Sequence, residues 1–143
     1  MVKVGEHITL DIIGTTGEYE PSFFENLVYK IAEKAKVTVL NISKYKFKPQ
    51  GFTLVALLAE SHISFHTFPE HGIISFDFFT CGKVSPSVAL DVIKNEIKCK
   101  RIVKKSFDRH TVENYFDTSS TSGMHKSYAV KDVIEDFVSK VGQ

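Results

Sequence analysis

The chain has 143 residues, a formal net charge of +1 and an apolar fraction of 43%. This length fits one domain over residues 1–143, and the near-neutral charge argues against nucleic acid or an anionic membrane as a partner. The chain shows neither a signal-peptide pattern nor about eighteen consecutive apolar residues, so no membrane association is expected and a cytoplasmic protein is predicted. Its two cysteines, Cys81 and Cys99, do not make a disulfide framework.

Strand and helix patterns alternate in the first part of the chain. Apolar and polar residues alternate over residues 8–12, which predicts a strand. A helix is predicted to begin with a capping box of Ser22 and Glu25 and to continue to Ala35. Two further strands are predicted over residues 37–42 and 52–59, the second of them central because nearly all of its residues are apolar.

The second part begins with a predicted antiparallel hairpin. Its strands cover residues 62–68 and 73–79. Ser85 and Pro86 are expected to start a helix that continues to about residue 98. A strand over 101–107, a polar loop over 108–126 and an amphipathic helix over 130–141 complete the chain. This order predicts an α+β two-layer sandwich with helices on one face of a mainly antiparallel sheet.

Reactive side chains are concentrated in residues 60–82. A carboxylate, hydroxyls, two histidines and a thiol lie among apolar strand residues there, and buried polar groups are costly unless they are partnered. His62 and His66 fall on one face of a strand about 13 Å apart, and with Cys81 they suggest zinc. No CxxC or HExxH spacing is present, so no metal is expected. A Cys81–His66 protease pair lacks a helix-borne nucleophile, and His7 is expected to be structural.

The same residues carry a resemblance to a known family. Residues 58–70 (LAESHISFHTFPE) and 76–82 (FDFFTCG) resemble the cleavage region and the thiol-bearing strand of prokaryotic S-adenosylmethionine decarboxylases. Gly5-x-His7 with Asp11 is similar to their opening strand, and residues 47–53 are similar to the segment before the cleavage strand. The likeness covers about residues 4–105 and is most specific over 47–82.

The resemblance implies a proenzyme that cuts itself between Glu60 and Ser61. The products would be a β chain of residues 1–60 and an α chain of residues 61–143 that begins with a pyruvoyl group made from Ser61. This group would form a Schiff base with the substrate amine and act as the electron sink, without a metal. His66 is implied as the processing base and Cys81 as the proton donor in turnover. Thr53 falls where relatives carry a serine that assists processing.

The resemblance also implies the substrate and the assembly. Phe47 and Phe68 match aromatic positions around the adenine of S-adenosylmethionine, and Glu70 matches an acidic residue near the nucleoside or its sulfonium. The product would be the aminopropyl donor for spermidine. A homodimer is expected, with a four-layer αββα arrangement and the active site near the subunit interface. Two alternatives stay open: a pyruvoyl decarboxylase of the same fold that acts on arginine or ornithine, and a catalytically silent regulatory paralogue.

Overall fold

The computed structural model describes residues 3–110. Their elements, in chain order, are β1 (Lys3–Ile13), α1 (Pro21–Ala35), β2 (Val39–Lys46), β3 (Phe52–Leu58), β4 (Ser61–Phe68), the 3₁₀ turn η1 (Pro69–His71), β5 (Ile73–Thr80), α2 (Val88–Glu96) and β6 (Arg101–His110). The loop predicted over 108–126 starts too early, because β6 continues to His110. The rest of that segment and the helix predicted over 130–141 lie outside the described residues. No helix within residues 3–110 is long and apolar enough to cross a membrane.

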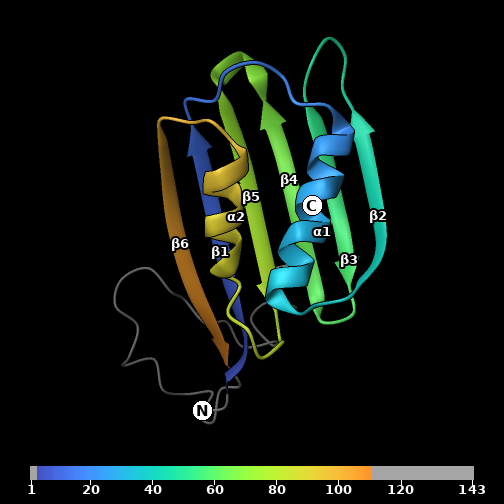
Figure 1. Cartoon of the computed structure of the whole chain (residues 1–143), viewed down its shortest axis with the longest axis vertical. Coiled ribbons are helices and arrows are strands. Elements are labelled where there is room, and N and C mark those ends of the chain that lie inside the picture. The colour runs from blue at the N-terminus through green and yellow to red at the C-terminus, as the bar shows by residue number, and fades with distance from the viewer. Residues whose placement is uncertain (1–2, 111–143) are drawn as a thin grey trace, which may run out of the picture. The chain divides into compact units, whose positions relative to one another are not determined.

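The six strands form one sheet in the order β2-β3-β4-β5-β1-β6, and every neighbouring pair is antiparallel. Helices α1 and α2 lie on the same face of this sheet (Figure 1). The predicted α+β two-layer architecture is therefore confirmed. The predicted hairpin is also confirmed, since β4 and β5 pair from Ser61↔Thr80 to Phe68↔Ile73.

Side-chain alternation along the strands places the core between the sheet and the helices. The ring of Phe65 on β4 is fully buried and lies 5.2 Å from Phe24 of α1 and 4.9 Å from Phe76 of β5, measured between ring centroids. Around these rings lie aliphatic side chains from β1, β3 and α1: Ile8, Leu10, Ile12, Leu54, Ala56, Leu27 and Ile31.

The other face of the sheet has no helix on it within residues 3–110 (Figure 1). We call it the open face. The apolar run over residues 52–59 does form an internal strand, between β2 and β4. Only alternate side chains of β3 are buried, however, and Val55 and Leu57 are 43% and 53% exposed on the open face. These two apolar side chains are therefore not part of the core between the sheet and the helices.

The expected helix starts are wrong in detail. Helix α1 begins at Pro21, with Glu20 as N-cap and no side-chain cap, so Ser22 and Glu25 do not form a capping box. A proline in the first turn already has the helical φ angle and lacks an N–H that would need a partner. Helix α2 begins at Val88, three residues after Ser85. The Ser85 hydroxyl accepts a hydrogen bond from the Ser87 N–H (3.2 Å) in the turn before the helix.

Candidate active site

The bond between Glu60 and Ser61 lies in the tight connection from β3 to β4. Two donors from Cys81 converge on the Glu60 carbonyl oxygen: the backbone N–H at 3.2 Å and the thiol Sγ at 3.1 Å. The Glu60 carboxylate in turn accepts a hydrogen bond from the backbone N–H of Thr38 (3.1 Å). Hydrogen bonds of this kind polarise a carbonyl and stabilise negative charge on its oxygen. The Glu60 carbonyl carbon, which is bonded to the Ser61 nitrogen, is therefore made more electrophilic.

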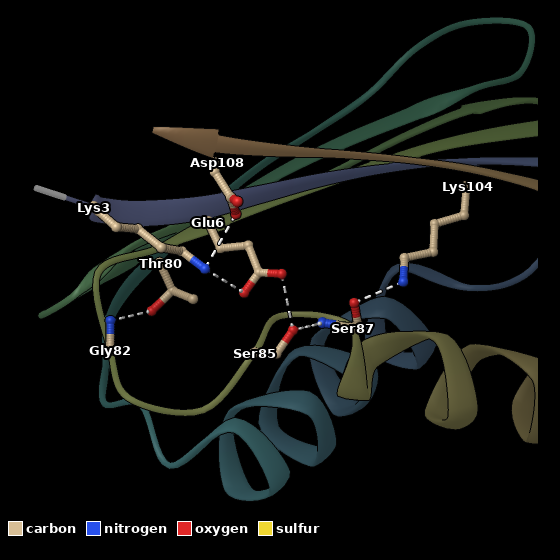
Figure 2. Close-up of polar contacts among 8 residues, drawn as sticks. All are labelled: Lys3, Glu6, Thr80, Gly82, Ser85, Ser87, Lys104 and Asp108. Atoms are coloured by element: carbon tan, nitrogen blue, oxygen red, sulfur yellow. Dashed lines mark hydrogen bonds and ion pairs between the residues drawn. The ribbon is translucent and has the colours of Figure 1, made fainter. Parts of the chain in front are cut away.

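A buried threonine shapes the turn that carries Cys81. Thr80 pairs with Ser61 across β4 and β5 and is 1% exposed. Its hydroxyl accepts a hydrogen bond from the backbone N–H of Gly82 at 2.9 Å (Figure 2). This bond spans Cys81 and bends the chain directly after the strand. Cys81 lies within this bend, where it contacts Glu60.

A polar network connects the segment after Cys81 to the edge of the sheet. Figure 2 shows the Glu6 carboxylate between the Lys3 ammonium (3.6 Å) and the Ser85 hydroxyl (3.2 Å). Lys3 also contacts Asp108 (3.1 Å), whose hydrogen bond raises the pKa of Lys3 above its usual value. A cavity of about 240 Å³ beside Cys81 is lined by residues of this network and of the turn. The space next to the thiol is therefore bordered by both positive and negative charge.

A second group of candidate residues lies at the other end of β4. Thr53 on β3 stands opposite His66 on β4, and the Thr53 Oγ1 lies 3.0 Å from the His66 Nδ1. This hydrogen bond orients the imidazole ring. A cavity of about 410 Å³ adjoins the pair, and its lining consists of Phe47, Gln50, Gly51, Thr53, His66, Thr67, Phe68 and Glu70.

The structure thus divides the residues predicted from the sequence into two groups. Glu60, Ser61 and Cys81 lie together at one end of β4, while the Thr53–His66 pair and the aromatic cavity lie at the other end. Ser61 and His66 are five residues apart on one strand, a separation of about 16 Å at the usual rise per residue. An odd separation also places the two side chains on opposite faces of the strand. One protomer alone does not bring this serine and this histidine together.

A further polar cluster on the open face was not predicted as a unit. The Nε2 atoms of His7 and His62 both approach Oδ1 of Asp77, and the His62 contact is 3.3 Å. The Ser64 hydroxyl donates to the other Asp77 oxygen at 2.6 Å. In residues 3–110 this is the one group of three potential metal ligands, and the combination of His62, His66 and Cys81 considered from the sequence does not form such a group. The sequence offered one indication of this cluster, the pairing of the two hairpin strands, which aligns Ser64 with Asp77.

Burial and hydrogen bonding act in opposite directions on Asp77. Partial burial raises its pKa, but the hydrogen bonds from Ser64 and His7 and the charges of the two imidazoles outweigh this effect. The pKa of Asp77 therefore lies below its usual value, and the side chain is a carboxylate at neutral pH.

Comparison with known proteins identifies relatives of the chain. The family model for S-adenosylmethionine decarboxylase matches residues 6–110. The chain is 38% identical over 111 residues to the S-adenosylmethionine decarboxylase proenzyme of Prochlorococcus marinus (strain MIT 9313), which covers 76% of this chain and 89% of that protein. It is also 38% identical over 113 residues to the proenzyme of the same name from Aquifex aeolicus (strain VF5), covering 77% of this chain and 84% of the relative.

A solved structure shares the fold. The crystal structure of the adenosylmethionine decarboxylase from Aquifex aeolicus VF5 matches with a TM-score of 0.70 and 36% sequence identity. The match covers 79% of this chain and 96% of the solved chain. At this level of sequence identity and coverage, the likeness extends to family membership as well as to fold.

Proposed function

We propose, because this chain belongs to the S-adenosylmethionine decarboxylase family, that it cuts itself between Glu60 and Ser61 and then decarboxylates S-adenosylmethionine. The product would serve as the aminopropyl donor for spermidine. The observation that carries the proposal is the pair of Cys81 donors on the Glu60 carbonyl oxygen. These donors act on the one carbonyl that self-cleavage requires.

The cleavage steps follow from the groups at this bond. The Ser61 Oγ attacks the Glu60 carbonyl carbon, and the two Cys81 donors stabilise the charge that develops on the oxygen. The C–N bond then breaks, which leaves an ester and a free amine on residue 61. A base removes the Ser61 α-proton and the Glu60 carboxylate leaves. The resulting dehydroalanine takes up water and releases ammonia, so that residue 61 becomes a pyruvoyl group.

The residues at the junction suit such a group. In turnover, its ketone supplies an electrophile for the substrate amine and an electron sink for the carbon–carbon bond that breaks. Departure of Glu60 removes the acceptor of the Cys81 thiol, which is solvent-exposed at the end of β5. Sγ then holds a proton close to residue 61 and can deliver it to the substrate α-carbon. A thiol is largely protonated at neutral pH, which suits this role.

The cavity beside His66 is the proposed site for the nucleoside. Phe47 and Phe68 line it and are 48% and 42% exposed, so both aromatic rings are accessible to a planar base or a sulfonium cation. Glu70 adds a carboxylate to the same lining. This combination of aromatic faces and negative charge suits S-adenosylmethionine better than it suits arginine or ornithine, which have no aromatic base.

We further propose that two protomers complete each site. His66 lies about 16 Å along β4 from Ser61, yet it is the imidazole positioned by Thr53 and the candidate base for the elimination step. A second copy, related by a two-fold axis, would supply its own His66 and its aromatic cavity to Ser61 and Cys81. The open face, with Val55 and Leu57 exposed, offers apolar surface for this contact. The expected assembly is the four-layer αββα homodimer.

Intact-mass spectrometry of the purified protein tests self-cleavage. We expect two species that correspond to residues 1–60 and 61–143, the second with a pyruvoyl N-terminus, while Ser61→Ala remains one full-length chain. Release of carbon dioxide should be seen from S-adenosylmethionine and not from arginine or ornithine. A wild-type chain that stays whole for days would instead support a catalytically silent protein, and activity on a basic amino acid alone would reject the substrate.

Co-expression of Ser61→Ala and His66→Ala chains tests the shared site. Each variant alone should remain uncut. In mixed dimers the His66→Ala chain keeps its own Ser61 and can use the imidazole of its partner, so cleavage of that chain should be restored. If mixed dimers form and both chains remain whole, the base acts within one chain and the shared-site proposal fails.

A further inference from the structure

We propose that His7, His62 and Asp77 form a binding site for one divalent transition-metal ion, with Zn²⁺ as the representative ligand. The site is distinct from the residues proposed for cleavage and decarboxylation. It lies on the open face of the sheet and uses side chains from three adjacent strands.

The strand register brings the three ligands together. Asp77 lies on β5, between β1 and β4. His7 of β1 and His62 of β4 both stand opposite Phe79, two residues beyond Asp77 on the same face. Side chains in such diagonal positions of an antiparallel sheet are within reach of one another when they are long. Because three hydrogen-bonded strands hold these side chains, they lose little conformational freedom when an ion binds.

The ligand atoms are close enough for one first-row metal ion, although the direct contact of His7 Nε2 with Asp77 Oδ1 must widen for both atoms to bind it. One ligand atom from each residue, two imidazole nitrogens and a carboxylate oxygen, lies within 4.8 Å of the other two. The separation of 3.3 Å between the His62 Nε2 and the Asp77 Oδ1 equals the edge of a tetrahedron with bonds of about 2.0–2.1 Å. Two imidazoles and a carboxylate are ligands that Zn²⁺, Co²⁺ and Ni²⁺ accept, whereas Mg²⁺ and Ca²⁺ prefer oxygen.

Neighbouring side chains orient these ligands. The Ser64 hydroxyl donates to Asp77 Oδ2 at 2.6 Å and leaves Oδ1 toward the imidazoles. The His7 ring packs at 5.7 Å from the Phe79 ring and at 6.4 Å from the Phe107 ring. Such outer contacts fix ligand geometry in metal sites.

The site is partly accessible. Within one protomer the His7, His62 and Asp77 side chains are 22%, 41% and 28% exposed, so an ion can reach them before the open faces of two copies pair. Three protein ligands leave a fourth tetrahedral position for water or another group.

Isothermal titration of the metal-free, full-length protein with ZnCl₂ tests the proposal, together with Co²⁺ absorption spectroscopy. We expect one Zn²⁺ per chain and a d–d spectrum of nitrogen and oxygen ligands. His62→Gln and Asp77→Asn should weaken binding by about 100-fold or more, and Ser64→Ala by about 10-fold. His71→Gln is the matched control, because His71 is exposed and lies outside the cluster, and it should bind as the wild type does.

Circular dichroism and unfolding midpoints of the apo variants show whether a loss of binding reflects a loss of folding. The wild-type spectrum decides the ligand set without any substitution. Thiolate-to-cobalt charge transfer that disappears in Cys81→Ser would place the ion at the thiol and overturn the proposal. Failure to bind one Zn²⁺ per chain, or equal affinity in folded His62→Gln and wild-type protein, would overturn it as well.

Discussion

In the mechanism proposed above, the side chain of Cys81 would serve two successive steps. Its thiol and its backbone N–H share the Glu60 carbonyl oxygen as acceptor before cleavage. After cleavage the thiol has lost that acceptor and lies beside the new N-terminus. The backbone donor does not depend on the side chain, so the two steps should respond differently to substitution of Cys81.

Cys81→Ala should therefore slow cleavage and reduce turnover more strongly. Loss of one of two donors to a developing oxyanion costs up to about 10²–10³ in rate, and the remaining N–H retains part of the stabilisation. Decarboxylation loses its proton donor altogether. Time courses of chain cleavage and of carbon dioxide release measure the two rates separately. Unchanged turnover by the cleaved Cys81→Ala protein would contradict the role of the thiol.

Thr53 offers a test of how the imidazole is held. Thr53→Val keeps the shape of the side chain and removes the hydroxyl that contacts His66 Nδ1, so cleavage should slow by about 10-fold or more, in the range of a positioned acid–base group. Thr53→Ser retains the hydroxyl and is the matched control. Gel densitometry of the uncut chain over time gives both rates. Equal rates for the valine and serine variants would show that this hydrogen bond has no role in cleavage.

Asp77 should contribute to stability in a pH-dependent way. A carboxyl group whose pKa is lowered by folding stabilises the folded state above its unfolded pKa of about 3.9, and this contribution is lost as the pH falls through the lower folded value. In metal-free buffer, Asp77→Asn should lower the free energy of unfolding by about 1–3 kcal/mol at pH 7. The difference should shrink below about pH 4. Urea unfolding at several pH values checks this, and a constant difference from pH 7 to pH 3 would contradict it.

Among the secondary-structure elements, sequence periodicity located most strands and helices but not their ends. The alternation in β1 and the turn between β4 and β5 are local signals, and both predictions were confirmed. The start of α1 was predicted at a Ser22–Glu25 capping box, whereas the helix begins at Pro21 without a side-chain cap. Two of the six apolar side chains of β3, Val55 and Leu57, lie on the open face. The apolar run over residues 52–59 did not indicate which of its side chains would face the helices.

The relation between elements explains why the candidate site was only partly predicted. Motif resemblance suggested which residues matter, but it gave no distance between Ser61 and His66. Their separation follows from both lying on the single strand β4. The cluster of Asp77 with two histidines depends on β5 lying between β4 and β1, a neighbour relation between strands that are far apart in the sequence.

Gly5 of β1 tests how closely β5 must approach. A Cβ atom on Gly5 would lie 2.6 Å from the Phe79 ring and 2.8 Å from the Thr80 carbonyl oxygen. Gly5→Ala should therefore displace the end of β5, lower the free energy of unfolding by about 1–3 kcal/mol and slow cleavage, because Cys81 follows directly. Gly17→Ala meets no atom within 4 Å and carries only the backbone strain of its φ of +79°, so it can lower stability but should leave the cleavage rate unchanged. Equal cleavage rates in the two variants would contradict this coupling.

At the scale of the whole molecule, the proposed enzyme depends on two events that the sequence of one chain does not display. Cleavage would convert a strand residue into the reactive N-terminus of residues 61–143, and pairing of protomers would supply the distant histidine and the aromatic cavity. Ser61 and Cys81 lie at one end of β4, and His66 with the aromatic cavity lies at the other. This separation is the structural reason to expect that cleavage takes place in a dimer.

Reductive trapping followed by intact-mass spectrometry tests the central claim most directly. The protein is incubated with S-adenosylmethionine and cyanoborohydride, and each chain is weighed. We expect a substrate-derived adduct on the fragment of residues 61–143, none on residues 1–60, none on uncut Ser61→Ala, and none with arginine or ornithine. An unmodified 61–143 fragment, or an adduct formed with a basic amino acid in place of S-adenosylmethionine, would contradict the assignment of a pyruvoyl-dependent S-adenosylmethionine decarboxylase.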